Sequence, residues 1–192
     1  MKYLAITAFA VGLALAGGAG AANIVVDALG NSSSGGVGAA TGLNLSTGQS
    51  FTVTVDPGDL WNAGALPRWS NADGLTHDLF ATGTDDSGQP AGTLIGEDFG
   101  LWTQSGLTAP FGTLVGDIAG VFHVLGTNFA GPAWATGALT LYYWDSNNGD
   151  NTQFITAAVN AAVPEPATWA LMLGGFSLAG LTLRARRRTA TV

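Results

Sequence analysis

Short runs of alternating hydrophobic and polar residues fill the middle of the chain and predict strands. The clearest run is Phe51–Val55, where apolar side chains at every second position alternate with threonine. The next four residues, Asp56–Asp59, are turn formers with proline at the position that favours a fixed φ. Further strands are predicted at Ile24–Ala28, Leu114–Ile118, Val121–Val124, Leu139–Trp144 and Phe154–Val159. No part of this region has a helical period.

Glycine, with Asn, Asp, Ser and Pro, interrupts these apolar runs about every ten residues, a spacing typical of many short strands. The pattern therefore predicts an all-β fold, an antiparallel β-sandwich or jelly roll. The polar, glycine-rich stretch Asn31–Gly38 is predicted to be a flexible lead-in or an exposed loop.

The first residues have the order of a secretory signal peptide. A positive start, Met1-Lys2-Tyr3, precedes the apolar run Leu4–Leu15 and the small residues 17–22. A signal peptide is predicted at residues 1–22, with cleavage after Ala21 or Ala22. The alternative is an uncleaved membrane anchor, for which the apolar run is short.

The other end of the chain has three parts. A Pro164-Glu165-Pro166 motif precedes the apolar run Ala167–Leu183, and a cluster of arginines follows: Arg184, Arg186, Arg187 and Arg188. The apolar run is near the lower limit for a bilayer span, and the arginines are expected to stay cytoplasmic. This predicts one transmembrane helix with the body of the protein outside the cytoplasm.

These three parts, residues 163–188, closely resemble the PEP-CTERM sorting signal of exopolysaccharide-producing Gram-negative bacteria. The resemblance implies recognition by an exosortase, a membrane transpeptidase-like enzyme, and cleavage near the Pro-Glu-Pro motif. It also implies a protein anchored in the inner membrane before processing, and then located in the cell envelope or outside the cell. A plain tail anchor is the alternative, although such an anchor does not need the motif. Residues 23–162 are then the extracytoplasmic domain.

Charge and cysteine content restrict the function of this domain. Between Asn23 and Val163 the chain has one cation, Arg68, and twelve carboxylates, a net charge of −11. Such a surface repels phosphate backbones, which argues against nucleic acid as a partner. The chain has no cysteine, which excludes disulfides, thiolate metal sites and a cysteine nucleophile.

Catalytic signatures are also missing. The chain has no Gly-x-Ser-x-Gly, no His-Glu-x-x-His and no P-loop, and His77 and His123 are its two histidines. The composition favours binding over catalysis, and the protein is predicted not to be an enzyme. An envelope hydrolase with His77 or His123 as its base is the alternative.

The densest polar cluster is Asp145–Thr152, between two predicted strands. One interpretation is a solvated hairpin loop, because Asn, Asp and Gly tolerate positive φ. The other is a calcium loop, because two carboxylates and three amides over a short span are the oxygen ligands that calcium prefers. It is not an EF-hand, since the required glutamate is absent.

Five segments, in order and in spacing, resemble the PA-I-type galactophilic lectin family over roughly residues 45–159. They are Trp61–Trp69, Asp73–Leu75, Gly112–Gly116, Gly137–Asp145 and Gly149–Asn151. The resemblance implies a small jelly roll in which calcium bridges the protein and two sugar hydroxyls. It assigns metal ligands to Asp145, Asp150, Asn151, Asn147 and the carbonyl of Gly64, and sugar binding to Asp73, Asp145 and Asp150.

The chain also departs from that family. Asn71-Ala72-Asp73 stands where the lectins carry a His and a Gln, so a preference for galactose does not transfer. The insertion Thr82–Gly100 has no counterpart. Four tryptophans could stack on sugars or pack in the interior: Trp61, Trp69, Trp134 and Trp144.

We therefore expect an exported protein of the envelope or exopolysaccharide matrix that binds carbohydrate with the help of calcium. The alternative is a structural or adhesion protein of the matrix that has lost the ligand site.

Overall fold

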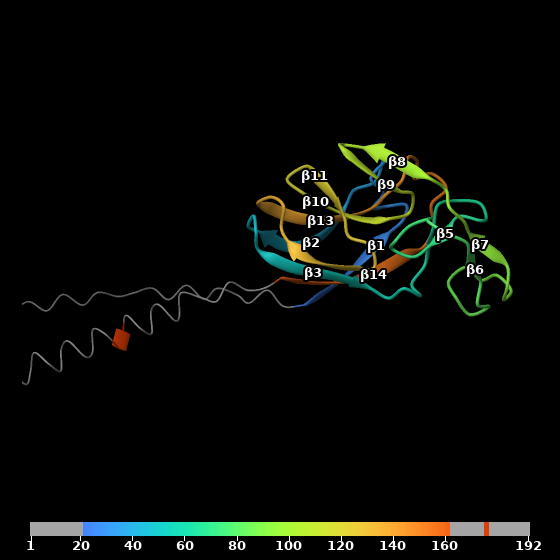
Figure 1. The fold of residues 1–192 in the computed structure, drawn as a ribbon, viewed down its shortest axis with the longest axis horizontal. Helices are drawn as coiled ribbons and strands as arrows, with labels where there is room; N and C mark the ends of the chain where they lie inside the picture. The colour runs from blue at the N-terminus through green and yellow to red at the C-terminus, as the bar shows by residue number, and fades with distance from the viewer. Residues whose placement is uncertain (1–20, 162–174, 177–192) are drawn as a thin grey trace, which may run out of the picture. The chain divides into compact units, whose positions relative to one another are not determined.

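The structure, a computed structural model, describes residues 21–161 and 175–176. Residues 21–161 form two four-stranded antiparallel sheets (Figure 1). The first sheet has the order β1 (Ala22–Asp27), β14 (Phe154–Ala161), β3 (Ser50–Val55) and β12 (Asn128–Pro132). The second has the order β11 (Val121–Val124), β10 (Leu114–Ile118), β13 (Gly137–Tyr143) and β2 (Ala39–Leu45).

The core lies between these sheets. Alternate side chains of β3, β13 and β14 turn inward, so that Val53 and Val159 from the first sheet share one apolar cluster with Leu139 and Leu141 from the second. Outward positions on the same strands, such as Thr54, are exposed. The all-β antiparallel sandwich predicted from alternation is therefore confirmed.

All six predicted strands are present, and none of their ends moves by more than two residues. Two further strands of these sheets, β2 and β12, were not predicted. Each lies at the edge of its sheet. Gly42 interrupts the apolar pattern of β2, and Gly131-Pro132 ends β12. An edge strand tolerates such residues because one side of its backbone has no strand to bond.

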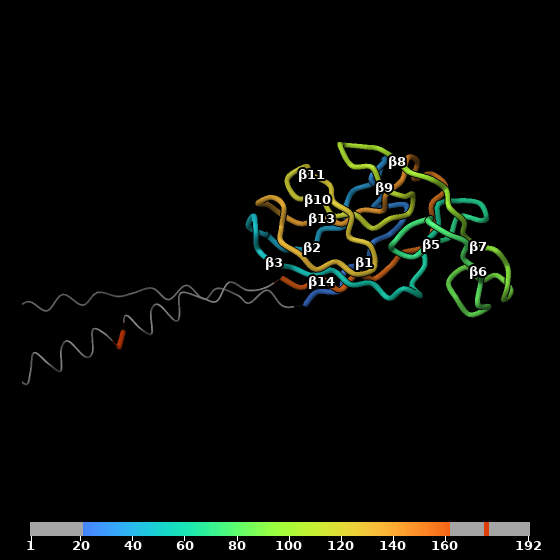
Figure 2. Tube along the Cα trace, in the orientation of Figure 1, coloured from blue at the N-terminus to red at the C-terminus, as the bar shows by residue number. Residues whose placement is uncertain are grey.

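Three small antiparallel pairs complete the domain. They are β4 (Trp61–Asn62) with β5 (Trp69–Ser70), β6 (Leu79–Phe80) with β7 (Leu94–Gly96), and β8 (Leu101–Gln104) with β9 (Leu107–Pro110). Figure 2 shows that the segments carrying β5, β6 and β7 gather at one end of the sandwich. The last pair turns at Ser105 and Gly106, both with positive φ, as a two-residue hairpin loop requires.

Asn31–Gly38 is a loop, as predicted, but it joins β1 to β2 and packs against the sandwich. Ser32 is fully buried and forms a bridge to Tyr143. The Ser33 hydroxyl donates to the backbone carbonyl of Asp145 at 3.1 Å. These contacts hold the polar stretch in place, so it is neither a lead-in nor free of the core.

The predicted signal peptide lies outside the described residues, apart from its last two positions. Also outside the described residues are the predicted sorting residues Pro164, Glu165, Pro166, Arg184, Arg186, Arg187 and Arg188. Gly175 and Phe176, from the predicted transmembrane run, are helical and exposed. Within 21–161 and 175–176, no helix has the length and apolar character needed to span a bilayer. The domain boundaries at residues 22 and 162 stay predictions.

Candidate functional site

The polar loop Asp145–Thr152, called the 145–152 loop below, connects β13 to β14. These two strands belong to different sheets and do not pair with each other. The hairpin interpretation is therefore wrong: the loop crosses from one sheet to the other at the rim of the core. The crossing is the reason why some of its polar side chains are buried.

Asp145 is the more buried carboxylate of the loop, with 5% of its surface exposed. The Ser146 N–H donates to its Oδ1 at 2.6 Å. Burial raises the pKa of Asp145, and the charge of Asp150 adds to the rise, while hydrogen bonds from Ser146, Asn151 and Asn147 oppose it. A carboxylate in such a place is costly to ionise, and a bound cation would lower that cost.

Asn151 lies beside Asp145 and is 1% exposed. Its Nδ2 donates to the carbonyl of Ala28 at 3.0 Å, which fixes the orientation of the amide. Its Oδ1 is buried and has no hydrogen-bond partner among the described residues. Buried acceptors without partners are rare, and an ordered water or an ion is what satisfies such an oxygen in many proteins.

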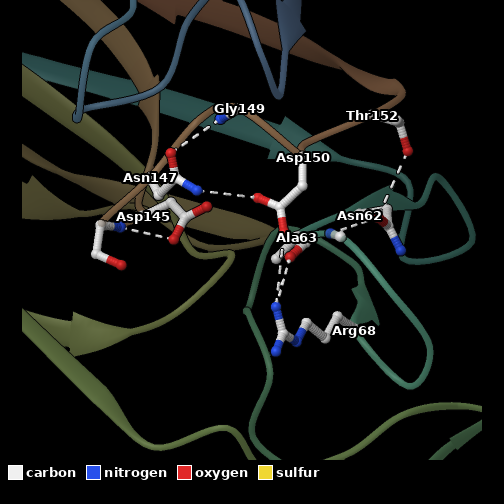
Figure 3. A network of polar contacts seen from close by, with 10 residues as sticks. Asn62, Ala63, Arg68, Asp145, Asn147, Gly149, Asp150 and Thr152 are labelled. Carbon is white, nitrogen blue, oxygen red and sulfur yellow. Dashed lines mark hydrogen bonds and ion pairs between the residues drawn. The ribbon is translucent and has the colours of Figure 1, made fainter.

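Asp150 is the outer carboxylate, with a side chain 49% exposed. Asn147 Nδ2 donates to its Oδ1 at 3.4 Å, and Arg68 Nη1 lies 3.7 Å from its Oδ2 (Figure 3). Figure 3 also shows the Asp145 side chain extending toward Asn147 and Asp150. The Asn147 oxygen accepts the N–H of Gly149 at 3.1 Å, so it is already used inside the loop.

The β4–β5 hairpin, 61–70, is fastened to this loop through Asn62. Backbone hydrogen bonds run in both directions between Asn62 and Thr152, at 3.0 and 3.1 Å. The Asn62 side-chain oxygen accepts the N–H of Gly64 at 2.6 Å. Together these bonds hold residue 64 against the loop.

Gly64 meets Asp150 at close range. Its φ is +113°, and a Cβ at this position would stand 2.3 Å from Asp150 Oδ2. Only glycine fits such an approach without moving the carboxylate. The structure thus brings together Asp145, Asn147, Asp150, Asn151 and Gly64, which the sequence resemblance had assigned to one site.

Asp73, assigned to sugar binding, has other contacts. Its Oδ1 accepts the N–H and the hydroxyl of Thr127, at 2.7 and 3.0 Å. These bonds tie Asp73 to the connection between β11 and β12. Among the described residues, no hydrogen bond joins it to the 145–152 loop. Its role toward a sugar stays a prediction.

The donor set of the site is oxygen, from carboxylates and amides. Across residues 21–161 and 175–176, no three His, Asp or Glu side chains group closely enough to hold a metal by themselves. A cation here would have to use Asp145 and Asp150 together with the Asn151 oxygen and backbone carbonyls. That mixture suits a hard cation such as calcium.

Of the four tryptophans considered for sugar stacking, two are fully buried and two are partly exposed. Trp61 and Trp144 are fully buried, and the Trp61 ring meets that of Tyr143 edge-on at 4.5 Å. Packing is therefore the role of these two. Trp134 is partly buried and stacks on His123 at 4.2 Å, which gives that histidine an aromatic neighbour.

Three residues near the loop were not assigned to a site from the sequence: Asn62, Arg68 and Phe99. Nothing in the sequence marks Asn62 as a site residue, because its role is to bond to Thr152, which is distant in the chain. Arg68 was visible as the single cation of the domain. Phe99 lies in the insertion, and the Arg68 guanidinium sits 4.5 Å above its ring.

The comparisons with known proteins concern the two parts of the chain separately. Residues 162–188 match the family described as the PEP-CTERM protein-sorting motif, which confirms that prediction. No curated protein is similar enough to the chain to count as a match. Among solved structures, the chain is similar to the EclA N-terminal domain, described as a PllA-like lectin, with 18% identity and a TM-score of 0.44. That likeness covers 74% of this chain and 95% of the other. At this level it bears on neither the metal nor the ligand.

Proposed function

From the premise that a chain with a PEP-CTERM sorting motif is exported and processed by an exosortase, we propose that its sandwich domain is a calcium-assisted carbohydrate-binding module. It works in the cell envelope or in an exopolysaccharide matrix. The protein's partners are then the exosortase during sorting and a glycan afterwards. The C-terminal helix holds the protein in the membrane before processing.

The observation that carries the calcium proposal is the pair formed by Asn151 and Asp145. The buried Asn151 Oδ1 lacks a hydrogen-bond partner among the described residues, and the neighbouring Asp145 carboxylate is almost fully buried. Leaving both groups without a cation costs free energy, on the order of 1–3 kcal/mol for an unmade hydrogen bond alone. A calcium ion would satisfy both oxygens at once.

The exposure of Asp150 supports the carbohydrate part. Calcium takes about six to eight oxygen ligands, and the residues that could supply them are the five assigned above. Asp150 is half-exposed, so the metal would sit at the rim of the domain with coordination positions open to solvent. Adjacent sugar hydroxyls are neutral oxygen donors that can fill such positions.

Calorimetry with calcium chloride on the full chain, purified in a mild detergent, tests the metal site. We expect Asp145→Asn to weaken calcium binding at least about ten-fold, because a charged ligand becomes a neutral one. Asp56→Asn is the matched control: it removes the same charge, and asparagine can still accept the N–H of Gly58 that Asp56 accepts at 2.9 Å. Equal calcium affinity in the wild type and Asp145→Asn would refute the site.

A glycan array probed with the calcium-loaded protein then tests the ligand. Spots that bind in calcium and are lost after chelation support a calcium-bridged sugar. An array without bound spots, for a protein that does bind calcium, refutes the carbohydrate part alone.

A matrix structural or adhesion role is the second candidate, and the internal bonds of two predicted contacts favour it. Asp73 is engaged by Thr127, and the Asn147 oxygen by Gly149. Bonded in this way, Asp73 is less available to a sugar and Asn147 is less available to a metal. In this case deletion of the protein weakens the matrix although the purified protein binds no glycan on the array.

A further inference from the structure

Arg68 is the one cation among twelve carboxylates in the domain, and it stands at the candidate calcium site. Its Nη1 lies 3.7 Å from Asp150 Oδ2 and 3.5 Å from the carbonyl oxygen of Ala63 (Figure 3). The guanidinium therefore interacts with a carboxylate that the proposed metal also needs. Without a metal, it is the counter-ion of the site.

Calcium would reverse the local charge. Asp145 and Asp150 with Arg68 sum to −1, and a divalent ion brings the sum to +1. Because calcium would bind the oxygens of Asp150, the electrostatic attraction between Asp150 and the Arg68 guanidinium would weaken. The loaded site thus becomes a small positive region on a domain whose net charge is −11.

The guanidinium has a second support that does not depend on Asp150. Its carbon lies 4.5 Å above the centre of the Phe99 ring, a cation–π contact. Phe99 belongs to the insertion Thr82–Gly100, which is docked by a bridge between Gly96 and Arg68. Arg68 would therefore stay at the rim after calcium binds, with 35% of its side chain exposed.

Resting on the proposed function, we infer that the calcium-loaded site selects sugars that carry a carboxylate, that is, uronic acids. Hydroxyls of the sugar bind the metal, and the carboxylate binds the guanidinium of Arg68. The planar fork of arginine matches a carboxylate through two parallel hydrogen bonds. Repulsion from the distant carboxylates is screened beyond about 8 Å at physiological salt, so the local charge decides binding at contact.

A matched pair of ligands tests the assignment without any variant. The probes are trigalacturonate and its fully methyl-esterified form, which share their ring hydroxyls and differ in charge. Calorimetry uses the full chain in mild detergent at saturating calcium. We expect the acid to bind at least about ten-fold tighter than the ester, in the range of a charge-assisted bidentate contact. Equal affinities would overturn the assignment.

The variant Arg68→Gln separates recognition from folding. We expect it to bind calcium as well as or better than the wild type, because a competing cation is gone, and to bind acid and ester within about two-fold of each other. Arg68→Lys keeps the positive charge but lacks the planar guanidinium. Its preference for the acid over the ester should therefore fall between that of the wild type and that of Arg68→Gln. If Arg68→Gln weakens the binding of acid and ester equally, Arg68 has a structural role only and the assignment is wrong.

The calcium titration of the wild type distinguishes the two levels of the proposal. If calcium does not bind, the proposed function fails and the acidic-sugar assignment falls with it. If calcium binds and the acid is not preferred, only the assignment fails.

Discussion

Gly64 is the residue at which the backbone of the β4–β5 hairpin approaches the carboxylate of Asp150. We predict that Gly64→Ala will weaken calcium binding about ten-fold or more, because the new Cβ would stand 2.3 Å from Asp150 Oδ2 and force the carboxylate away. Calorimetry measures the affinity.

Gly48→Ala is the control for backbone strain in that experiment. Gly48 also has a positive φ, of +84°, but a Cβ there would meet nothing within 4 Å. Both variants should lose about 1–2 kcal/mol of unfolding free energy from the left-handed conformation. Loss of calcium affinity in both would show that strain, and not displacement of Asp150, is the cause.

Asp59 offers a prediction of pH dependence. Its Oδ2 accepts the N–H of Thr156 at 2.7 Å. Burial raises the pKa of Asp59 above its ordinary 3.8, and the charges of Asp86 and Asp56 add to the rise, against the hydrogen bond from Thr156. A raised pKa means that the folded state prefers the protonated acid. The stability contribution of this group is therefore full below pH 3.8 and is lost as pH rises through the raised value.

Asp59→Asn should thus be slightly more stable than the wild type at neutral pH, by about 1–2 °C in Tm, because the side chain is partly exposed. Asparagine still accepts the N–H of Thr156. The difference should disappear below pH 3.8, where both side chains are neutral. Thermal unfolding followed by circular dichroism from pH 3 to pH 8 measures it, and a gap that widens toward acid pH would contradict the prediction.

At the scale of elements, the insertion Thr82–Gly100 is attached to the sandwich through β7. Leu60, Ala81 and Ile95 form a small apolar cluster of their own, with Trp69 and Leu79 packed against it. The insertion is thus a docked element and not a free extension of a loop. This docking brings Phe99 to Arg68.

Gly96 allows β7 to lie this close to β5. A Cβ at Gly96 would stand 2.1 Å from the carbonyl oxygen of Trp69, which is backbone and cannot rotate away. We predict that Gly96→Ala lowers the free energy of unfolding by about 1–3 kcal/mol, as overpacking does. Urea unfolding measures the change.

Gly58→Ala is the matched control for this variant. A Cβ at Gly58 would make only an ordinary contact, 3.4 Å from Asp56 Oδ1. Its unfolding free energy should stay within about 0.5 kcal/mol of the wild type. A Gly96→Ala protein as stable as this control would show that β7 is not packed tightly on β5.

At the scale of the whole molecule, the proposed calcium site couples ligand binding to stability, because its ligands come from elements far apart in the chain. Asp145 follows β13, Asn151 precedes β14, and Gly64 belongs to the β4–β5 hairpin. Calcium at about 100 times its Kd should raise the free energy of unfolding by about 2.7 kcal/mol. Chelation should therefore lower Tm in the wild type by more than in Asp145→Asn, whose weaker calcium binding leaves less stabilisation to lose. A Tm that is indifferent to chelation in both proteins would contradict the site.

The sorting motif makes a second prediction for the whole protein. Glu165→Ala changes the centre of the Pro-Glu-Pro motif inside the matched residues 162–188. We expect the unprocessed form to accumulate in the membrane fraction, which immunoblots of cell fractions can measure. Thr189→Ala, outside the matched residues, serves as the control. Normal processing of Glu165→Ala would show that the exosortase does not recognise the protein through Glu165 of this motif.

Local sequence patterns were sufficient to predict the fold class and the sorting motif of this protein. Local alternation, as in Phe51–Val55, reports which face of a strand is buried, and the Pro-Glu-Pro motif with its apolar run and arginines is a contiguous signal. Both can be read because the information lies within a few neighbouring residues. The edge strands β2 and β12 have no such local pattern, because they form by pairing with the strands beside them.

The course of the 145–152 loop, from one sheet to the other, is visible only in the folded structure. Whether Asp145 and Asn151 are solvated or buried depends on the loop crossing between two sheets, and no local pattern encodes that crossing. The same holds for Arg68, whose partners Asp150 and Phe99 are far from it in the chain. Burial and charge pairing are set by contacts between distant segments, so only the folded chain shows which polar groups are buried here and which side chains lie beside them.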